Sequence, residues 1–538
     1  MPEAAWRVGT VIVDKLIQAV TRYPLLLSLV LGALAATGFA PLIWWPVTLA
    51  CFALWMLLIH DAPTLKQVLL RGWIFGVAHF TVGNNWIQRA FTYQDAMPHW
   101  LGYLAVVLLS LYLALYPAIA TGLAWRFARA RPVGNNRTMA GSGFVLVFAA
   151  AWIATEWLRG TLFTGYPWNP LSEIWLPIVP LAAIGRLVGT YALSGLTIVV
   201  AGSLLLLVQR RWRFAAGTAV SALVLALASL GPVPVSTRTL DTAPRIRVIQ
   251  PNLDQEERPR DDYAEQNLLA IEALSGTPGP APRLIVWPEG ALRFFIEDGY
   301  PAISYWRGDP LVTRRRIASR LGPNDIVLAG GNALKFDAQG NVTAGTNSVF
   351  AIDSRARILG RYDKAHLVPW GEYLPMRPIM SAIGLSRLVP GDFDFDPGQA
   401  AGGFTLPAFG NVGFQICYEM IFSGETVDRR HRPAFIFNPS NDSWYGSWGP
   451  VQHLAQARMR AIEEGLPIIR ATPTGISAII DANGTLLATV PPNVAGAIEL
   501  PIPPPHEPTL FARVGNLMAF VTAAVMLLFA VAIRRWPR

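Results

Sequence analysis

Long apolar runs separated by short polar loops fill the first part of the chain and predict a bundle of membrane-spanning helices. A helix needs about 20 apolar residues to cross a bilayer, and a shorter run can cross when neighbouring helices support it. We therefore expect seven spans before residue 235 and an eighth span near residue 530. The apolar runs cover residues 24–40, 46–59, 72–88, 101–124, 143–158, 182–208, 213–231 and 514–533.

The stretch from residue 245 to residue 500 has a different pattern, in which short β-rich runs alternate with helical ones. This alternation is typical of an α/β layered sandwich. We expect a transmembrane bundle over 1–235, an extracytoplasmic catalytic domain over 240–505, and a last transmembrane helix with a basic tail over 512–538. The predicted strands are 246–250, 284–287, 326–329, 348–352, 412–417, 434–438 and 468–471, and the predicted helices include 263–274 and 451–464.

Basic residues lie mainly in the loops after the second, fourth and sixth apolar runs. Cytoplasmic loops of membrane proteins carry an excess of Lys and Arg. The beginning of the chain is therefore expected to be cytoplasmic, with residues 235–510 outside and the final basic tail inside again. The loop residues that set this orientation are Lys66, Arg71, Arg126, Arg129, Arg131, Arg137, Arg210, Arg211 and Arg213.

Composition narrows the class of protein. With 52% hydrophobic and 15% charged residues, the chain of 538 residues is too apolar for an ordinary soluble enzyme. Its net charge of +9 does not indicate a nucleic-acid partner, because the basic residues follow apolar segments and form no patches interleaved with aromatic residues. The seven histidines lack the spacing of metal ligands, so no metal or other cofactor is expected, and structural roles are favoured for His366 and His453.

The chain has two cysteines, and their surroundings differ. Cys51 lies within an apolar run and is expected to be a small buried apolar residue, so no disulfide framework is predicted. Cys417 follows an apolar strand and is a candidate nucleophile. A reactive cysteine works as the thiolate, so it needs a base for its proton and a positive charge for the intermediate. Two other strand-end stretches, 283–290 and 360–366, offer those two groups as Glu289 and Lys364.

The order of Glu289, Lys364 and Cys417 at strand ends resembles the nitrilase, or carbon-nitrogen hydrolase, superfamily. Other stretches, spread over most of the chain, resemble its membrane-bound branch, the apolipoprotein N-acyltransferase family. These stretches are GFAP at 38–41, FTGYPW at 163–168, PWGEYLP at 369–375, NPSNDSWYG at 438–446 and ARMRA at 457–461.

The resemblance implies a fold and an activity. The fold is a nitrilase-like αββα sandwich carried by eight transmembrane helices. The activity is the transfer of a fatty acyl chain from a phospholipid donor, through a thioester on Cys417, to the N-terminal amine of a diacylglyceryl-modified lipoprotein. The implied location is the bacterial inner membrane, as a multi-pass protein with its catalytic domain on the periplasmic side, and we expect a monomer.

The resemblance also suggests roles for individual residues. Glu289 is implied as the base and Lys364 as the group that stabilises the oxyanion. Glu372 is implied to lie near the site, where its carboxylate would position the Lys364 ammonium. Tyr418 and Glu419, which follow the cysteine, are candidates either for orienting neighbouring groups or substrate, or for a purely structural role.

Two other classes of protein are considered. A membrane-tethered amidase or nitrilase, which hydrolyses the thioester with water, would need the same catalytic residues, although eight spans exceed what tethering requires. A transporter with an extracytoplasmic domain would have no need of Cys417, and the intramembrane charges are few. Of these, Glu156 and Arg159 lie one helical turn apart and favour a structural pair over a substrate contact.

Two positions depart from the family pattern, namely Arg89 and the stretch 255–259.

Overall fold

The computed structural model describes residues 22–93, 97–129, 140–230, 243–253, 262–388, 394–399 and 402–535. The chain divides into two compact units. One consists of Met1–Asn85, Tyr103–Leu230 and Asn516–Arg538, and the other of Trp86–Gly102 and Gly231–Gly515. The expectations about residues 1–21, the loop arginines Arg131 and Arg137, the stretch 255–259 and residues 536–538 lie outside the described residues.

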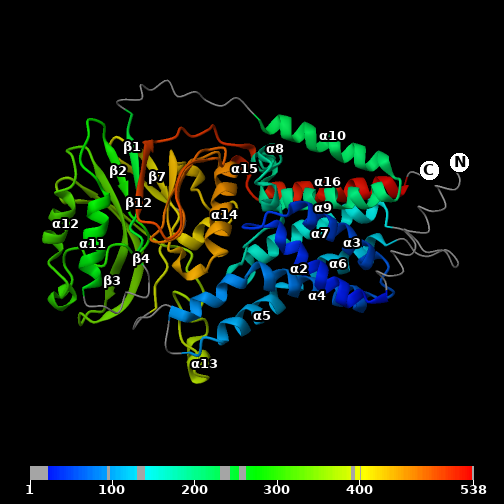
Figure 1. Ribbon diagram of the computed structural model, residues 1–538, viewed down its shortest axis with the longest axis horizontal. Helices are drawn as coiled ribbons and strands as arrows, with labels where there is room; N and C mark the ends of the chain where they lie inside the picture. The colour runs from blue at the N-terminus through cyan, green and yellow to red at the C-terminus, as the bar shows by residue number, and fades with distance from the viewer. Residues whose placement is uncertain are drawn as a thin grey trace. The chain divides into compact units, whose positions relative to one another are not determined.

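The first unit is helical (Figure 1). A helix forms at each of the predicted apolar runs, because a chain in an apolar medium must satisfy its backbone hydrogen bonds internally. The helices are α2 (Pro24–Ala35), α3 (Trp45–His60), α4 (Leu65–Gly83), α5 (Leu101–Leu113), α6 (Leu115–Ala128), α7 (Ser142–Thr161), α8 (Val179–Ala182), α9 (Gly185–Val208), α10 (Trp212–Ser229) and α16 (Leu517–Arg535).

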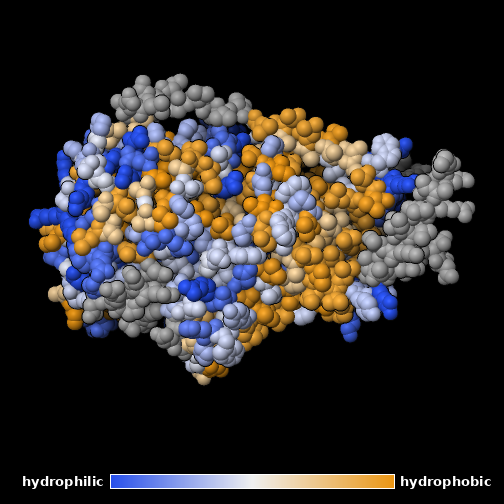
Figure 2. Space-filling model, viewed as in Figure 1, coloured by the Kyte–Doolittle hydropathy of each residue, from blue (hydrophilic) through white to orange (hydrophobic). Residues whose placement is uncertain are grey.

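Within the described residues, five helical segments are long and apolar enough to cross a membrane. They are Leu101–Ala128, Ser142–Thr164, Gly185–Val208, Trp212–Ser229 and Leu517–Arg535, and two shorter apolar segments are Pro24–Gly38 and Trp45–His60. Hydrophobic side chains also gather on the surface of this unit, over α10 and α16 (Figure 2). Large exposed apolar surfaces of this kind mark contact with a partner or a lipid phase. The unit has the character of a membrane protein.

Helix α4 starts seven residues earlier than the apolar run 72–88 predicts. The Thr64 side chain accepts a hydrogen bond from Gln67 N and caps the helix, so its polar first turns are helical as well. Lys66 and Arg71, expected in the loop after the second apolar run, lie in these turns instead, and the buried Arg71 side chain donates to the carbonyl of Leu58. The apolar pattern misses these turns because it identifies only the apolar part of a helix and not the polar turns that follow an N-cap.

The second unit contains two six-stranded sheets. The first has the order β12 (Gly496–Pro501), β1 (Arg245–Gln250), β2 (Arg283–Val286), β3 (Ile326–Phe336), β4 (Val342–Asp353) and β5 (Ile358–Asp363). The second has the order β11 (Leu486–Val490), β10 (Ser477–Ile480), β9 (Ile468–Ala471), β8 (Phe435–Pro439), β7 (Gly410–Phe414) and β6 (Gly403–Leu406). Strands β1, β2 and β3 are parallel, as are β7, β8 and β9.

Helices pack on one face of each sheet. Apolar side chains of α11 (Tyr263–Leu274) and α12 (Pro310–Ala318), such as Ile271 and Ile317, form a core with β1 to β4. Apolar side chains of α14 (Gly449–Glu464), such as Ala457 and Ala461, form a second core with β8 to β10. Figure 1 shows these helices on the outer sides of the sheets. Together with the short helices α13 (Arg377–Ala382) and α15 (Leu510–Val514), this gives a nitrilase-like αββα arrangement.

Candidate active site

Cys417 begins a short 3-10 turn, Cys417–Ile421, just after β7. The strand predicted at 412–417 is therefore wrong at its end, because β7 stops at Phe414. Cys417 has a φ of 51°, in the left-handed region that is costly for a residue with a Cβ atom. Backbone strain of this kind persists only where the surrounding structure enforces it.

A buried polar network behind the cysteine enforces this turn. The carbonyl oxygen of Cys417 lies 3.1 Å from Nε2 of His453 on α14. A carbonyl can only accept, so Nε2 carries the proton and donates. Nδ1 of His453 lies 3.1 Å from Arg470, which in turn contacts both oxygens of Asp442 at 2.6 Å. Burial and the charge of Arg470 lower the pKa of His453, so the ring is neutral. His453 has the structural role that its sequence context favours, and it positions Cys417.

Lys364 lies directly after β5, and its side chain is 1% exposed. Its ammonium contacts both oxygens of Glu372, at 3.0 and 2.9 Å, and lies 3.7 Å from Oε1 of Glu289. Burial alone would lower the pKa of Lys364, but the charges of Glu372 and Glu289 outweigh it and raise the pKa. Lys364 therefore stays charged.

Asn347, on β4, joins the two carboxylates and was not identified from the sequence. Its amide nitrogen lies 2.6 Å from Oε1 of Glu289 and 2.9 Å from Oε1 of Glu372. Oε2 of Glu289 is buried and has no hydrogen-bond partner among the described residues, so this oxygen can accept a proton. An asparagine in a strand gives no pattern in the sequence, and only the pairing of β4 with β5 brings Asn347 opposite the Lys364 turn.

Glu419 connects the Lys364 turn to the Cys417 turn. Its Oε1 accepts from the backbone nitrogens of Ala365 and His366, at 2.7 and 3.1 Å, and its Oε2 accepts from Ile416 N at 2.6 Å. Burial raises the pKa of Glu419 to about 7, against the charge of Lys364 and these hydrogen bonds, which lower it. Glu419 is therefore placed to fix the geometry between ammonium and thiol.

The thiol of Cys417 is buried among charged and polar groups. Burial is the largest cause that raises its pKa, and the charge of Glu289 adds to it. The charge of Lys364 and a 3.1 Å contact with the Tyr445 hydroxyl lower it, for a net pKa of about 12. The group is therefore a neutral thiol near pH 7. It becomes a nucleophile only if a base removes its proton during the reaction.

Tyr418 and His366 form an aromatic cluster beside these groups. Their ring centroids are 5.7 Å apart, and each ring packs on Phe422. These contacts place Tyr418 next to the site and are consistent with a packing role. Within the described residues no group of three or more His, Cys, Asp or Glu side chains has the geometry of a metal site.

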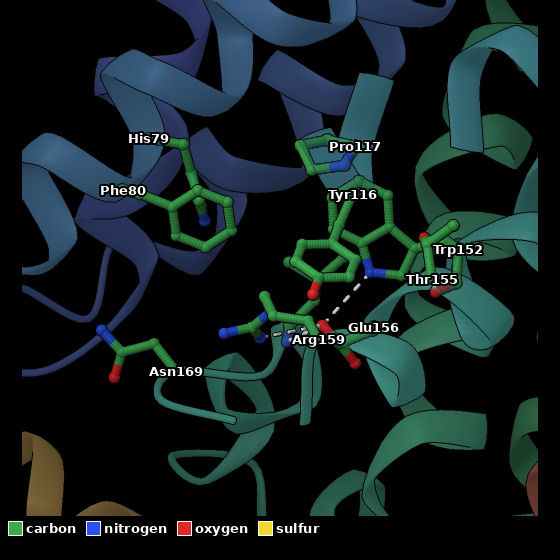
Figure 3. A pocket seen from close by; sticks show the side chains of 10 residues that line it. His79, Phe80, Tyr116, Pro117, Trp152, Thr155, Glu156, Arg159 and Asn169 are labelled. Carbon is green, nitrogen blue, oxygen red and sulfur yellow. Dashed lines mark hydrogen bonds and ion pairs between the residues drawn. The ribbon is translucent and has the colours of Figure 1, made fainter. Parts of the chain in front are cut away.

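Glu156 and Arg159 lie in the first unit and line a pocket there (Figure 3). Oε1 of Glu156 accepts from Trp152 Nε1 at 3.2 Å and from the backbone of Leu171 at 3.0 Å. The guanidinium of Arg159 donates to the carbonyl oxygens of Tyr166 and Trp168, both at 2.8 Å. The pair therefore holds the loop after α7 against the helix.

The two sheets and the thiol, ammonium and carboxylate groups at their strand ends define a carbon-nitrogen hydrolase type of domain. The model of the family described as carbon-nitrogen hydrolase matches residues 245–504, and the model described as the apolipoprotein N-acyltransferase N-terminal domain matches residues 31–203. The chain belongs to the apolipoprotein N-acyltransferase family.

Relatives of that name match along almost the whole chain. The apolipoprotein N-acyltransferase of Rhodopseudomonas palustris is 33% identical over 95% of both chains, and that of Bradyrhizobium diazoefficiens is 33% identical over 94% of both. The protein of the same name from Caulobacter vibrioides is 33% identical over 84% of this chain and 83% of its own. The similarity thus includes both the helical unit and the two-sheet unit.

Proposed function

We propose that this protein transfers a fatty acyl chain from a phospholipid to the α-amine of the N-terminal diacylglyceryl-cysteine of a lipoprotein. Family membership supports the acyltransferase activity. The observation that carries the mechanism is the buried Lys364 ammonium, held by Glu372 and close to Glu289, whose charge acts on the Cys417 thiol. This arrangement supplies a nucleophile, a base and a positive charge within one dry site.

The first half-reaction forms a thioester. Glu289 takes the proton of Cys417, and the sulfur attacks the ester carbonyl of the phospholipid. Negative charge develops on the carbonyl oxygen, where Lys364 and backbone N–H groups stabilise it. The intermediate collapses, the C–O bond of the ester breaks, and the proton held by Glu289 passes to the departing lysophospholipid oxygen. No cofactor enters this scheme.

The second half-reaction forms the amide. The α-amine of the lipoprotein attacks the thioester, again through an oxyanion beside Lys364, and Glu289 accepts a proton from the amine. The thiolate leaves and is protonated again. An α-amine has a pKa of about 8, so a good fraction of it is the neutral nucleophile near neutral pH. The order of events is ping-pong, because one cysteine serves both substrates in turn.

A membrane setting suits two lipid-anchored substrates. We propose eight spans, seven within 1–235 and one within 512–538, with the catalytic domain 240–505 on the periplasmic side of a bacterial inner membrane. The loop charges support this orientation, because the basic residues follow alternate apolar runs. We propose that the protein works as a monomer, since one chain supplies every group in the scheme.

The experiment that tests this function is intact mass spectrometry of the full chain in detergent with phospholipid alone. We expect one acyl adduct on Cys417, absent in Cys417→Ala and retained in Cys51→Ala, which removes the other cysteine. Adding a diacylglyceryl-cysteine peptide to the isolated acyl-enzyme should give N-acyl peptide and free thiol. Release of free fatty acid alone, with peptide present, would replace the transferase with the hydrolase alternative.

A further inference from the structure

Tyr445 lies against the sulfur of Cys417. It belongs to the stretch NPSNDSWYG at 438–446, but no role for this tyrosine is indicated by the sequence. It ends the short turn Asp442–Tyr445 that follows β8. Its hydroxyl oxygen lies 3.1 Å from Sγ of Cys417, within hydrogen-bond distance for sulfur. The side chain is 8% exposed, so water does not compete for this contact.

The ring of Tyr445 is held on several sides, which fixes the direction of its hydroxyl. Trp86 packs edge-on against it with ring centroids 4.7 Å apart, and His453 does so at 5.6 Å. Gly449 lies so close that a Cβ atom there would come within 2.2 Å of the Tyr445 Cβ. A glycine at position 449 is thus required for this placement. A ring fixed in this way loses little entropy when its hydroxyl binds.

The direction of the hydrogen bond depends on the charge of the sulfur. When Cys417 is a thiolate it has no proton, so the Tyr445 hydroxyl must donate. Burial and the charge of the neighbouring Cys417 keep the pKa of Tyr445 well above its ordinary value, so the hydroxyl retains its proton near neutral pH. The contact therefore stabilises the thiolate state specifically.

The other groups that face the sulfur act in opposite directions. Lys364 favours the thiolate by its charge, whereas Glu289 and Asp442 disfavour it, and His453 contacts only the carbonyl oxygen of Cys417. A neutral donor is effective in such a site. A second positively charged donor would need another buried carboxylate to balance its charge, whereas a neutral donor would not. Tyr445 meets this requirement.

We propose that Tyr445 is a further catalytic residue, whose hydroxyl donates a hydrogen bond to the Cys417 sulfur whenever that sulfur is negatively charged. In the first half-reaction it stabilises the thiolate as the proton moves to Glu289. In the second it stabilises the same thiolate as it leaves the amide carbon. The tyrosine proton stays on its oxygen in both steps. This inference rests on the proposed function only in taking Cys417 as the nucleophile.

The test compares Tyr445→Phe with the parent in a Cys51→Ala background, so that iodoacetamide alkylates only Cys417. The substitution keeps the ring and its packing and removes only the hydroxyl. We expect alkylation to be about tenfold or more slower at each pH from 7 to 9, because a hydrogen bond to a charged group is lost. Single-turnover acylation by phospholipid, and discharge to the peptide, should slow by a similar factor. The matched control is Tyr305→Phe, which removes a hydroxyl bonded to the carbonyl of Glu297 at 2.7 Å and should follow the parent.

A second variant separates the hydrogen bond from any effect on folding. Replacing Tyr445 with 3,5-difluorotyrosine keeps the hydroxyl and makes it a stronger donor, so alkylation should become faster than in the parent at the same pH. Equal alkylation rates in the parent and Tyr445→Phe would overturn the inference, as would slower alkylation with the fluorinated residue. Alkylation needs no acyl donor. A parent that fails to transfer acyl chains to the peptide would therefore contradict the proposed function and leave the test of Tyr445 intact.

Discussion

At the scale of single residues, the site combines charges that the sequence reveals with neutral groups that it does not. Glu289, Lys364 and Cys417 stand out because each follows a strand and is chemically unusual there. Asn347 and Tyr445 do not, because an amide in a strand or a tyrosine in a turn is common, and its meaning depends on what the fold brings within about 3 Å. Sequence patterns therefore identify the reactive groups more readily than the groups that hold them.

Lys364 gives the sharpest prediction for a single charge. In Lys364→Arg the charge is kept, but a planar guanidinium cannot occupy the narrow space between two carboxylates in the same way. We expect acyl-enzyme formation to fall by about 100-fold or more, as when an oxyanion donor is removed. Single-turnover mass spectrometry measures this rate. Lys335→Arg is the matched control, since Lys335 is exposed and paired with Asp396 at 2.9 Å. A near-parental rate in Lys364→Arg would argue against an oxyanion role for Lys364.

Glu419 gives a prediction about pH. With a pKa of about 7, it becomes protonated as the pH falls below neutral, and the added proton displaces one of its hydrogen-bond donors. Acyl-enzyme formation should therefore decline below about pH 7, and Glu419→Gln should be slower at all pH values without that step. A decline of the same shape in the glutamine variant would assign the titration to another group.

The raised pKa of Glu419 also makes the stability of the fold depend on pH, and in the direction opposite to activity. The folded protein holds the Glu419 proton more tightly than the unfolded chain, where the pKa is near 4.5. The contribution of Glu419 to the free energy of unfolding is therefore present below about pH 4.5 and is lost as the pH rises to about 7. Thermal unfolding of the parent against Glu419→Gln over this range measures it.

At the scale of helices and strands, the sequence pattern predicts the bounds of some elements well. It does not predict how far strands extend by pairing with their neighbours. Helix α11 and strand β9 have the predicted bounds. Strands β3 and β4 run several residues beyond the predicted apolar cores, since their antiparallel pairing continues through glycine and polar residues that the apolar pattern does not mark. The edge strands β6, β11 and β12 were not predicted, because much of β6 and β11 is exposed and β12 is only half-buried along its length.

Gly330 on β3 shows how an element positions a group of the candidate active site. A Cβ atom at Gly330 would lie 2.2 Å from the carbonyl oxygen of Pro288, inside the turn that carries Glu289. Gly330→Ala should push this turn away from Lys364, lower stability by about 1–3 kcal/mol, and reduce acyl-enzyme formation. Thermal unfolding and single-turnover acylation are the measurements. Gly279→Ala is the control, because a Cβ there meets nothing within 4 Å. Equal effects of the two substitutions would rule out the close approach as the cause.

At the scale of the whole molecule, one chain contains a helical unit with exposed apolar surfaces and a two-sheet unit with a buried polar site. An enzyme acting on soluble amides has no need of a helical unit with exposed apolar surfaces. An enzyme acting on two substrates anchored in a bilayer does need one, because confinement to a membrane raises the local concentration of the substrates and limits their orientations. The presence of the helical unit is therefore tied to the proposed acceptor and donor.

The orientation of the two-sheet unit provides the prediction at this scale. In a background without Cys51 and Cys417, we expect Ala338→Cys, in the exposed turn between β3 and β4, to react with a membrane-impermeant maleimide in spheroplasts. Arg129→Cys, just after α6, should react only after lysis, because basic residues stay on the cytoplasmic side. The two positions lie on opposite sides of the membrane if an odd number of spans separates them. Labelling of position 129 with protection of position 338 would place the candidate active site in the cytoplasm, away from lipoproteins that have already been translocated.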